Sequence, residues 1–260
     1  MTTAFEPSIS IIILTKNNFS MFKDCVDSIF KHTSYENFSL YIGDTGSDDD
    51  QLELYQEYLK QYKGYVKGYV IFDYYHFPKN NNWIIENIAT GSDYILFCND
   101  DIVLQNDAIS LMMKHVDDSV GTIGCKLLYP NNTIQHAGHL HIIPNNRDSI
   151  NHYNVTHKLL NEPDRDIETC TVDGNTFAFC LVNTHTFLQM GRLNESYEHC
   201  FEDVGFCISC SRSNLKHLCI GNAVCIHHES ISRRKLSTYI SSSDINLFRN
   251  NIHNFYNEIK

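Results

Sequence analysis

Several features are missing from this sequence, and each absence argues against a class of protein. No stretch approaches the roughly 18 apolar residues of a membrane-spanning helix. Positive charge is scarce, because 20 Lys and Arg stand against 31 Asp and Glu, for a formal net charge of −11. Such a chain has no electrostatic footprint for a nucleic-acid backbone. It would also repel a free anionic substrate, so a phosphate compound would need a cation as an intermediary.

The common phosphate-binding loops and a secretion signal are missing as well. Neither G-x-G-x-x-G nor G-x-x-x-x-G-K-[ST] occurs. Residues 1–8 are short and polar, and the apolar run at 9–14 is too brief for a signal peptide. We therefore expect a cytoplasmic protein, a location where disulfides are rare.

The ten cysteines do not form a recognisable zinc motif. Cys207 and Cys210 make a lone C-x-x-C, with Cys200 upstream. A zinc site normally needs two such pairs or two well-spaced histidines. The same spacing fits two core residues on one helix face, so we interpret these cysteines as buried thiols and keep zinc as the alternative.

The apolar pattern predicts a parallel sheet covered by helices. Strand-like runs at 9–14, 38–42, 69–74 and 94–98 alternate with segments of helical spacing. After Gly121 the strand-like pieces are shorter, and a long polar stretch at 144–166 is interpreted as a surface excursion. The tail from residue 232 onward has a weak apolar helical face. One large domain with a nucleotide-binding front half fits this order best.

Polar residues follow each of the four predicted strands. They are Thr15, Asp44, Lys79, Asn82, Asn99, Asp100 and Asp101. The carboxyl ends of parallel strands meet at one edge of the sheet, where ligands bind in open α/β folds. Two adjacent Asp at such an edge suit a hard divalent cation that also contacts phosphates. The alternative is that residues 99–101 form a solvated turn.

A second acidic pair and a late histidine add to these candidates. Glu202 and Asp203 begin a predicted helix, where the helix dipole alone favours acidic residues. The functional interpretation makes Asp203 a general base, held ionised by the same dipole. His227 ends a late strand and is either a cation ligand or a surface residue.

Taken together, the motifs resemble those of inverting glycosyltransferases of family 2, which have the GT-A fold, and in particular the rhamnosyltransferase-like branch. The resemblance covers roughly residues 8–232, and its specificity lies in the order and spacing of the pieces. The matching pieces are residues 11–17, 43–47, 77–82, 94–101, 120–130, 133–138, 201–204 and 223–230.

The resemblance implies an α/β architecture: a Rossmann-like, mostly parallel sheet flanked by helices, a smaller antiparallel region on the acceptor side and a C-terminal helical extension. Residues 1–232 would form the GT-A domain, with a nucleotide-binding half at about 8–118 and an acceptor half at about 119–232. Residues 233–260 would form the extension.

The resemblance also implies a role for each candidate residue. Asp101, with His227, would hold Mn²⁺ or Mg²⁺ on the donor diphosphate. Asp203 would deprotonate the acceptor hydroxyl, with Glu202 beside it. The remaining donor contacts would come from Thr15 and Asp44 at the base, Asn99 and Asp100 near the ribose or sugar phosphate, and Lys79 and Asn82 on the donor side.

Two positions depart from the family pattern or match it weakly. Gly205 stands where the family usually has a second Asp after the base. Asp173 falls in a glycine-containing segment that resembles the acceptor side, and it is a weaker site candidate.

The predicted function is metal-dependent inverting transfer from a UDP- or dTDP-sugar to a hydroxyl of a glycan or lipid-linked saccharide, in surface polysaccharide synthesis. One alternative is a non-catalytic nucleotide- or glycan-binding module on the same scaffold, because fold does not dictate function. A nucleotidyltransferase ranks lower, since residues 9–18 contain only one basic residue, Lys16. Membrane contact would be peripheral at most, through the cluster at 233–235, which fits a solvated face equally well.

Overall fold

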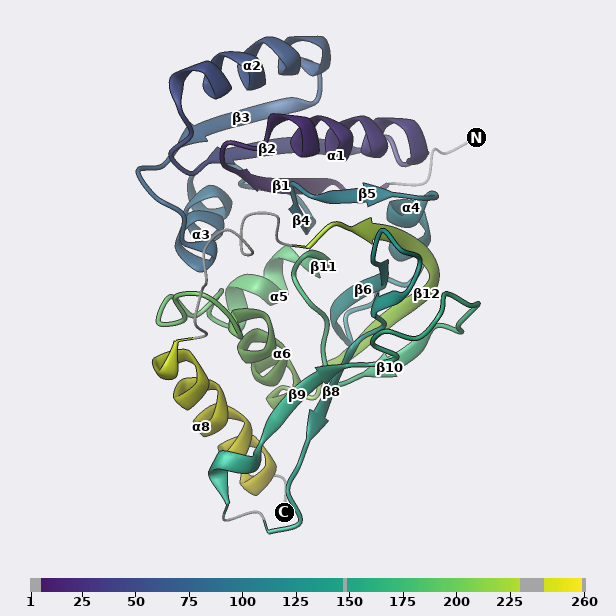
Figure 1. Ribbon diagram of the computed structural model, residues 1–260, viewed down its shortest axis with the longest axis vertical. Helices are drawn as coiled ribbons and strands as arrows, with labels where there is room; N and C mark the ends of the chain where they lie inside the picture. Colours follow the sequence, from purple (N-terminus) through teal and green to yellow (C-terminus); the bar gives the residue numbers. More distant parts are fainter. Residues whose placement is uncertain (1–5, 147–148, 230–240, 259–260) are drawn as a thin grey trace.

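The computed structural model describes residues 6–146, 149–229 and 241–258. One large sheet runs through the molecule (Figure 1). Its main strands are β1 (Ile9–Thr15), β2 (Phe38–Asp44), β3 (Val66–Ile71), β4 (Tyr94–Asn99), β6 (Val120–Leu128), β10 (Cys170–Val172), β11 (Phe179–Asn183) and β12 (Lys216–His227). They lie in the order β10-β12-β6-β11-β4-β1-β2-β3. Two short strands join at the side: β5 (Ile102–Leu104) pairs with β12, and β7 (Ile134–His136) pairs with β6.

The front half of the sheet is parallel, as the sequence predicted. Strands β1, β2, β3 and β4 all run in one direction, and β11 lies antiparallel between β4 and β6. All seven residues of β1 are buried because helices cover both faces of the sheet. Ile11 and Ile13 face one core, and Ile12 and Leu14 face the other, as the two-residue period of a strand requires.

Helices pack on both faces of this sheet (Figure 1). The helices are α1 (Phe19–His32), α2 (Asp49–Leu59), α3 (Phe77–Asn87), α4 (Ala108–Met113), α5 (Thr184–Gln189), α6 (Glu202–Arg212) and α8 (Ser242–Glu258), with single 3₁₀ turns η1 (Lys60–Tyr62) and η2 (Ile150–His152). Helices α1, α2 and α4 contribute to the core on one face, and α3, α5 and α6 contribute to the core on the other.

The rear half differs from the sequence prediction in two places. The apolar runs at 218–220 and 223–226 predict two separate late strands, but they belong to one long strand, β12, whose pairing with β6 shifts register between Ile220 and Val224. The predicted excursion is partly ordered, because β9 (Asn154–His157) pairs antiparallel with β8 (His139–Ile142) to form a separate two-stranded sheet. This pairing joins two four-residue strands that are separated by residues 143–153. The alternation of apolar and polar residues within strands this short does not predict that they pair.

The C-terminal helix is an integral part of the fold. Phe248 and Ile252 of α8 join a core cluster with Val204 and Ile208 of α6. Asp244, near the start of α8, is fully buried and accepts hydrogen bonds from three successive backbone N–H groups at residues 198, 199 and 200, at 2.9–3.3 Å. The C-terminal helix therefore holds the segment that leads directly into α6.

Replacing Asp244 with Ala should destabilise the protein by about 3 kcal/mol, because buried N–H groups would lose a charged acceptor. The measurement is the free energy of unfolding from chemical denaturation. Asn246→Ala, at an exposed position of the same helix, should change it by less than about 0.5 kcal/mol. Equal effects of the two substitutions would contradict the anchoring role of Asp244.

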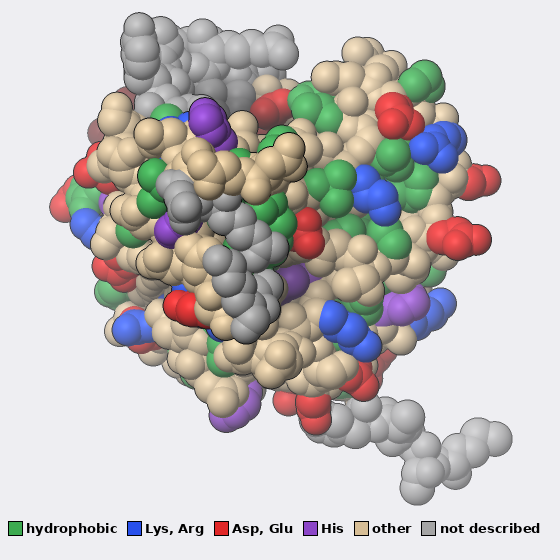
Figure 2. All heavy atoms as spheres, turned by 90° about the horizontal axis from the view of Figure 1, so that it is seen from below, with side chains coloured by type: hydrophobic (Ala, Val, Ile, Leu, Met, Phe, Trp, Pro, Cys, Tyr) green, Lys and Arg blue, Asp and Glu red, His purple; other side chains and the backbone are tan. Residues whose placement is uncertain are grey.

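The surface carries few basic side chains, as the acidic composition predicts. On the face seen in Figure 2, the described Lys and Arg side chains lie scattered among Asp and Glu, without a broad basic patch. Within the described segments, no helix is both long and apolar enough to cross a bilayer.

All ten cysteines are free, and Cys207 and Cys210 are buried in the core beneath the sheet. The basic cluster Arg233-Arg234-Lys235 lies outside the described residues.

Candidate functional site

The carboxyl ends of β1 and β4 are joined by a partly buried hydrogen bond. The Oγ1 of Thr15 donates to Oδ2 of Asp100 at 2.7 Å. The hydroxyl of Tyr55 in α2 lies 3.2 Å from the same Oγ1 and accepts the N–H of Asn18 at 2.7 Å. Burial raises the pKa of Asp100 to about 7. The sequence placed Thr15 and Asp100 at the same edge, and the structure connects them directly.

Asp101 and His227 meet although they are far apart in the chain. Strand β12 pairs with β5 so that His227 lies opposite Ile102, immediately after the acidic turn. The Nε2 of His227 lies 3.2 Å from Oδ1 of Asp101 and 3.5 Å from Nδ2 of Asn99. The N–H of His228 also donates to the backbone oxygen of Asp101 at 3.1 Å. Three of the predicted residues thus converge at one point.

A hydrogen-bond chain behind His227 selects the tautomer of its neutral ring. The amide of Gln135 donates from Nε2 to a carboxylate oxygen of Glu229 at 3.0 Å, so its Oε1 faces the imidazole. Nδ1 of His227 lies 2.7 Å from that Oε1 and must therefore be the donor. In the neutral ring, the lone pair of Nε2 then faces the Asp101 carboxylate.

Two acceptors that face each other in this way require a proton or a cation between them. The carboxylate oxygen suits Mn²⁺ or Mg²⁺, and the imidazole nitrogen can complete a ligand shell that is otherwise made of oxygens. The chain through Gln135 resembles the outer-shell support that orients metal-bound histidines. The residues present therefore fit a divalent cation.

Asp44, at the end of β2, presents an oxygen that the chain itself does not satisfy. Its Oδ1 accepts the N–H groups of Gly46 and Ser47 at 3.0 and 2.8 Å. Its Oδ2 is buried and has no hydrogen-bond partner among the described residues. A buried acceptor without a donor is costly, so a ligand N–H or O–H at this position would be stabilised.

The two donor-side candidates on α3 lie in different environments. Lys79 is exposed, and its backbone N–H donates to the ring of the N-capping His76 at 3.4 Å. Asn82 is buried. Its Oδ1 accepts a hydrogen bond from the backbone N–H of Leu193, and its Nδ2 donates to the backbone C=O of Leu193 and to the carboxylate of Glu195. Asn82 therefore fastens α3 to the loop before α6, and its contact with a donor stays a prediction.

The predicted base lies at the first turn of α6. Asp203 accepts the N–H of Val204 at 2.7 Å and that of Phe177, just before β11, at 3.4 Å. Burial raises the pKa of the Asp203 carboxyl. Glu202 is the first residue of the helix and is half-buried.

The structure explains the departure at Gly205. A Cβ at this position would lie only 2.9 Å from the ring of Tyr197, which is fully buried, so there is no room for a second carboxylate. Asp173, the weaker candidate, accepts the N–H of His141 at 2.8 Å and so anchors strand β8.

Sequence reasoning missed the residues that support the site. In the sequence, Gln135 stands out only as part of the motif at 133–138. Tyr55 stands out only as one of the apolar residues along the helix that becomes α2. A group of histidines at 136, 139 and 157 was also missed. The pKa of His157 is lowered mainly by burial, while the charges of Asp203 and Glu229 act in the opposite direction. These contacts depend on strand pairing and have no signature in local spacing.

The fold is the GT-A fold of nucleotide-sugar-dependent glycosyltransferases. It is similar to GalNAc-T7, solved with UDP, GalNAc and Mn²⁺, with a TM-score of 0.74 at 12% identity over 97% of this chain and 49% of the other. It is also similar to the mannosyltransferase PcManGT from Pyrobaculum calidifontis, in complex with GDP-Man and Mn²⁺, with a TM-score of 0.63 at 8% identity over 97% of this chain and 71% of the other. The sequence model of glycosyl transferase family 2 matches residues 10–183, and the chain belongs to this family.

Two curated relatives are similar over most of the chain. The O-antigen biosynthesis protein RfbC of Myxococcus xanthus is 26% identical over 235 residues, which are 88% of this chain and 18% of that protein. The uncharacterized protein y4gI of Sinorhizobium fredii is 28% identical over 250 residues, which are 87% of this chain and 25% of that protein. The chain therefore spans a quarter or less of the relatives it matches.

Proposed function

We propose that this domain is a metal-dependent inverting glycosyltransferase. It would move a sugar from a nucleoside-diphosphate donor, a UDP- or dTDP-sugar, to a hydroxyl of a glycan or lipid-linked saccharide. The observation that carries the proposal is the Asp101–His227 pair, oriented by Gln135 at the edge where the parallel strands end. The acceptor class, in surface polysaccharide synthesis, rests on the name of the O-antigen biosynthesis relative.

The cation would be held by Oδ1 of Asp101 and Nε2 of His227. When bound, Mn²⁺ or Mg²⁺ neutralises the charge that develops on the diphosphate leaving group. Gln135 and Glu229 keep the His227 ring in the tautomer that presents Nε2. Holding these groups in advance lets them act without reorganisation during the reaction.

The nucleotide would be recognised by the ends of β1, β2 and β4. Oδ2 of Asp44 is available to accept an N–H of the base, and Thr15 holds Asp100 where it can meet the ribose. Asn99 borders the same edge, and the exposed Lys79 would reach a phosphate.

Asp203 would take the proton of the acceptor hydroxyl, whose oxygen attacks the anomeric carbon as the diphosphate leaves. A single displacement inverts that carbon and requires one base without a covalent intermediate. The carboxylate is held by the N–H of Val204, and its burial makes it a stronger base than an exposed Asp.

The pH dependence of turnover should reflect the raised pKa of Asp203. Only the ionised carboxylate can accept a proton, so activity should rise with pH through the folded-state pKa, which lies above the ordinary Asp value of about 3.9. The measurement is kcat/KM against pH at saturating Mn²⁺. An acidic limb that lies at or below the ordinary Asp range would contradict this role.

The proposal is tested by thermal shift with Mn²⁺ and a panel of nucleotides and nucleotide sugars, together with nucleotide release. Stabilisation follows donor affinity by mass action, about 2.7 kcal/mol at 100 times the Kd. Asp44→Asn should lower the affinity for the nucleotide that stabilises the parent protein, because the amide of Asn can present an N–H where the base needs an acceptor. Asp118→Asn, at an exposed position, is the control.

Each outcome has a defined meaning. No shift with any UDP, dTDP or GDP compound would overturn the donor assignment. If a nucleotide sugar stabilises the protein but no nucleotide is released, either to water or with a saccharide acceptor added, the non-catalytic binding module would be favoured.

A further inference from the structure

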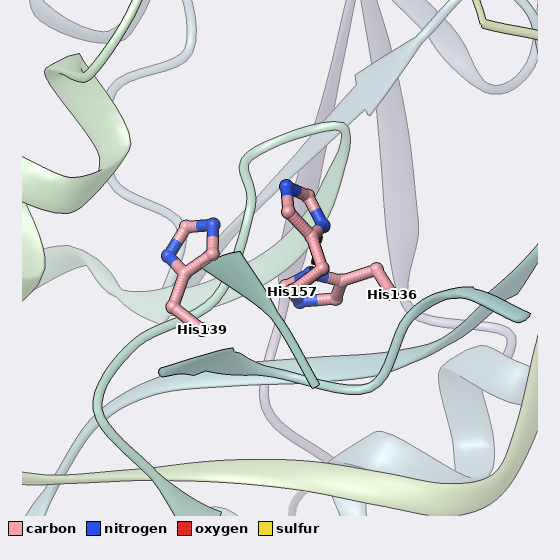
Figure 3. Close-up of side chains that lie close together, drawn as sticks. All are labelled: His136, His139 and His157. Atoms are coloured by element: carbon pink, nitrogen blue, oxygen red, sulfur yellow. Dashed lines mark hydrogen bonds between the residues drawn. The ribbon is translucent and has the colours of Figure 1, made fainter. Parts of the chain in front are cut away.

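Three imidazole rings, from His136, His139 and His157, converge at the base of the β8–β9 hairpin (Figure 3). His136 ends β7, His139 begins β8 and His157 ends β9. The ring centroids lie 4.8–5.2 Å apart. One nitrogen from each ring lies within 4.8 Å of the other two. None of these rings is part of the donor-side arrangement at Asp101 and His227.

The backbone brings the three rings together. His139 and His157 are direct partners in the antiparallel β8–β9 ladder. Gly138 makes the turn from β7 into β8 with a φ of +100°, and a Cβ there would lie 2.3 Å from the side chain of Val172. Only glycine fits this turn, which places His136 and His139 next to each other. The cluster is therefore built into the hairpin and does not depend on long flexible side chains.

His136 and His139 are buried, His157 is half-buried, and Nε2 of His136 accepts the N–H of Thr176 at 3.4 Å. His136 and His139 are 1% and 3% exposed, and burial lowers the pKa of both well below the usual range. Nδ1 of His136 lies 2.8 Å from Nδ1 of His157, so one proton is shared between two nitrogens. Nδ1 of His139 is buried without a partner in the described structure. An unpaired buried nitrogen of this kind calls for a further ligand.

We propose that His136, His139 and His157 bind a transition-metal ion of the Zn²⁺ type. Neutral imidazoles suit Zn²⁺, Co²⁺ or Ni²⁺, whereas Mg²⁺ and Mn²⁺ prefer oxygen ligands. Three histidines leave a fourth position open for water or another ligand. The charges of Asp203 and Glu229 act on His157 and also favour a cation here.

Binding changes the cluster in a defined way. The metal displaces the proton between His136 and His157, and this proton moves to the other nitrogen of the same ring, so that both rings bind as neutral imidazoles. The two nitrogens move from 2.8 Å to about 3.4 Å, the spacing of two ligands about 2.0–2.1 Å from a tetrahedral Zn²⁺. The ion fastens the β8–β9 hairpin to the end of β7. This site does not depend on the donor or acceptor proposed above.

The test uses the whole 260-residue chain carrying Asp101→Asn and His227→Gln, so that the donor-side groups do not take up the probe. Calorimetric titration with Zn²⁺ should show one equivalent bound. Co²⁺ should give the intense visible absorption of a four-coordinate ion. His139→Gln in this background should weaken Zn²⁺ binding by more than about 100-fold, since loss of an outer-shell partner alone costs about 10–100-fold. His152→Gln, an exposed histidine in the same excursion, should leave the affinity unchanged.

Two results would overturn the site. One is the absence of bound Zn²⁺ at an equimolar ratio when the cluster is intact, which would leave the rings as a hydrogen-bonded group. The other is equal Zn²⁺ affinity of His139→Gln and its parent, with folding confirmed by circular dichroism. The titration of the intact cluster decides the question even if the variant unfolds. Neither result bears on donor binding, which is measured with nucleotides and Mn²⁺.

Discussion

Asp203→Asn is expected to lower kcat by about 10²–10⁴-fold, the usual contribution of a positioned general base. The amide cannot take the proton of the acceptor hydroxyl. The substitution keeps the size of the side chain, and its oxygen can still accept the N–H of Val204. Donor affinity should therefore remain close to the parent value, because Asp203 lies at the start of α6 and the nucleotide contacts lie at the ends of β1, β2 and β4.

The measurements are product formation at saturating donor and nucleotide affinity by calorimetry. Glu198→Gln is a matched control, because Glu198 precedes the same helix and its side chain is exposed. A fall in kcat of less than tenfold would remove Asp203 from the role of base. A parallel loss of donor binding would instead indicate that the substitution disturbs the fold.

The second large effect is expected for Asp101→Asn. The amide carries no charge for a cation, so about 3 kcal/mol of stabilisation of the leaving diphosphate should be lost, or about 100-fold in rate. Unlike the change at Asp203, this one should also weaken Mn²⁺-dependent donor binding and slow hydrolysis of the donor by water. The readouts are nucleotide affinity with and without Mn²⁺ and the rate of nucleotide release.

Asp118→Asn removes one acidic charge at an exposed position and controls for the change in net charge. If Asp101→Asn binds the donor with the same Mn²⁺ dependence as the parent, Asp101 is not a ligand. The two variants together separate a defect in donor handling from a defect in acceptor activation.

Much of the front half could be predicted from local sequence. Strand β1 is buried on both faces and reads as a continuous β-branched run, so its position and the parallel arrangement follow from composition and alternation. Thr15, Asp44 and Asp101 were found because strands of a parallel sheet end at one edge. The family motifs added the glycosyltransferase class, which periodicity alone does not specify.

The rear half could not be predicted in the same way. The pairing of His139 with His157 closes a hairpin across residues 143–153, and neither strand is longer than four residues. The tail was expected to be helical, but its buried Asp244 and its anchoring of residues 198–200 depend on where α8 packs. Such long-range contacts leave no pattern in short windows of sequence.

By itself, the sequence determined the class of fold and the strand ends that carry polar residues, and it supplied Asp101 and Asp203 as candidates for the metal ligand and the base, because these depend on local periodicity and ordered motifs. The tertiary structure decided how those residues meet. It places His227 against Asp101 through the β5–β12 pairing, fixes the ring through Gln135 and Glu229, and gathers three histidines at one turn. The physical reason is that hydrogen-bond geometry and burial arise between segments far apart in the chain, where only packing can specify them.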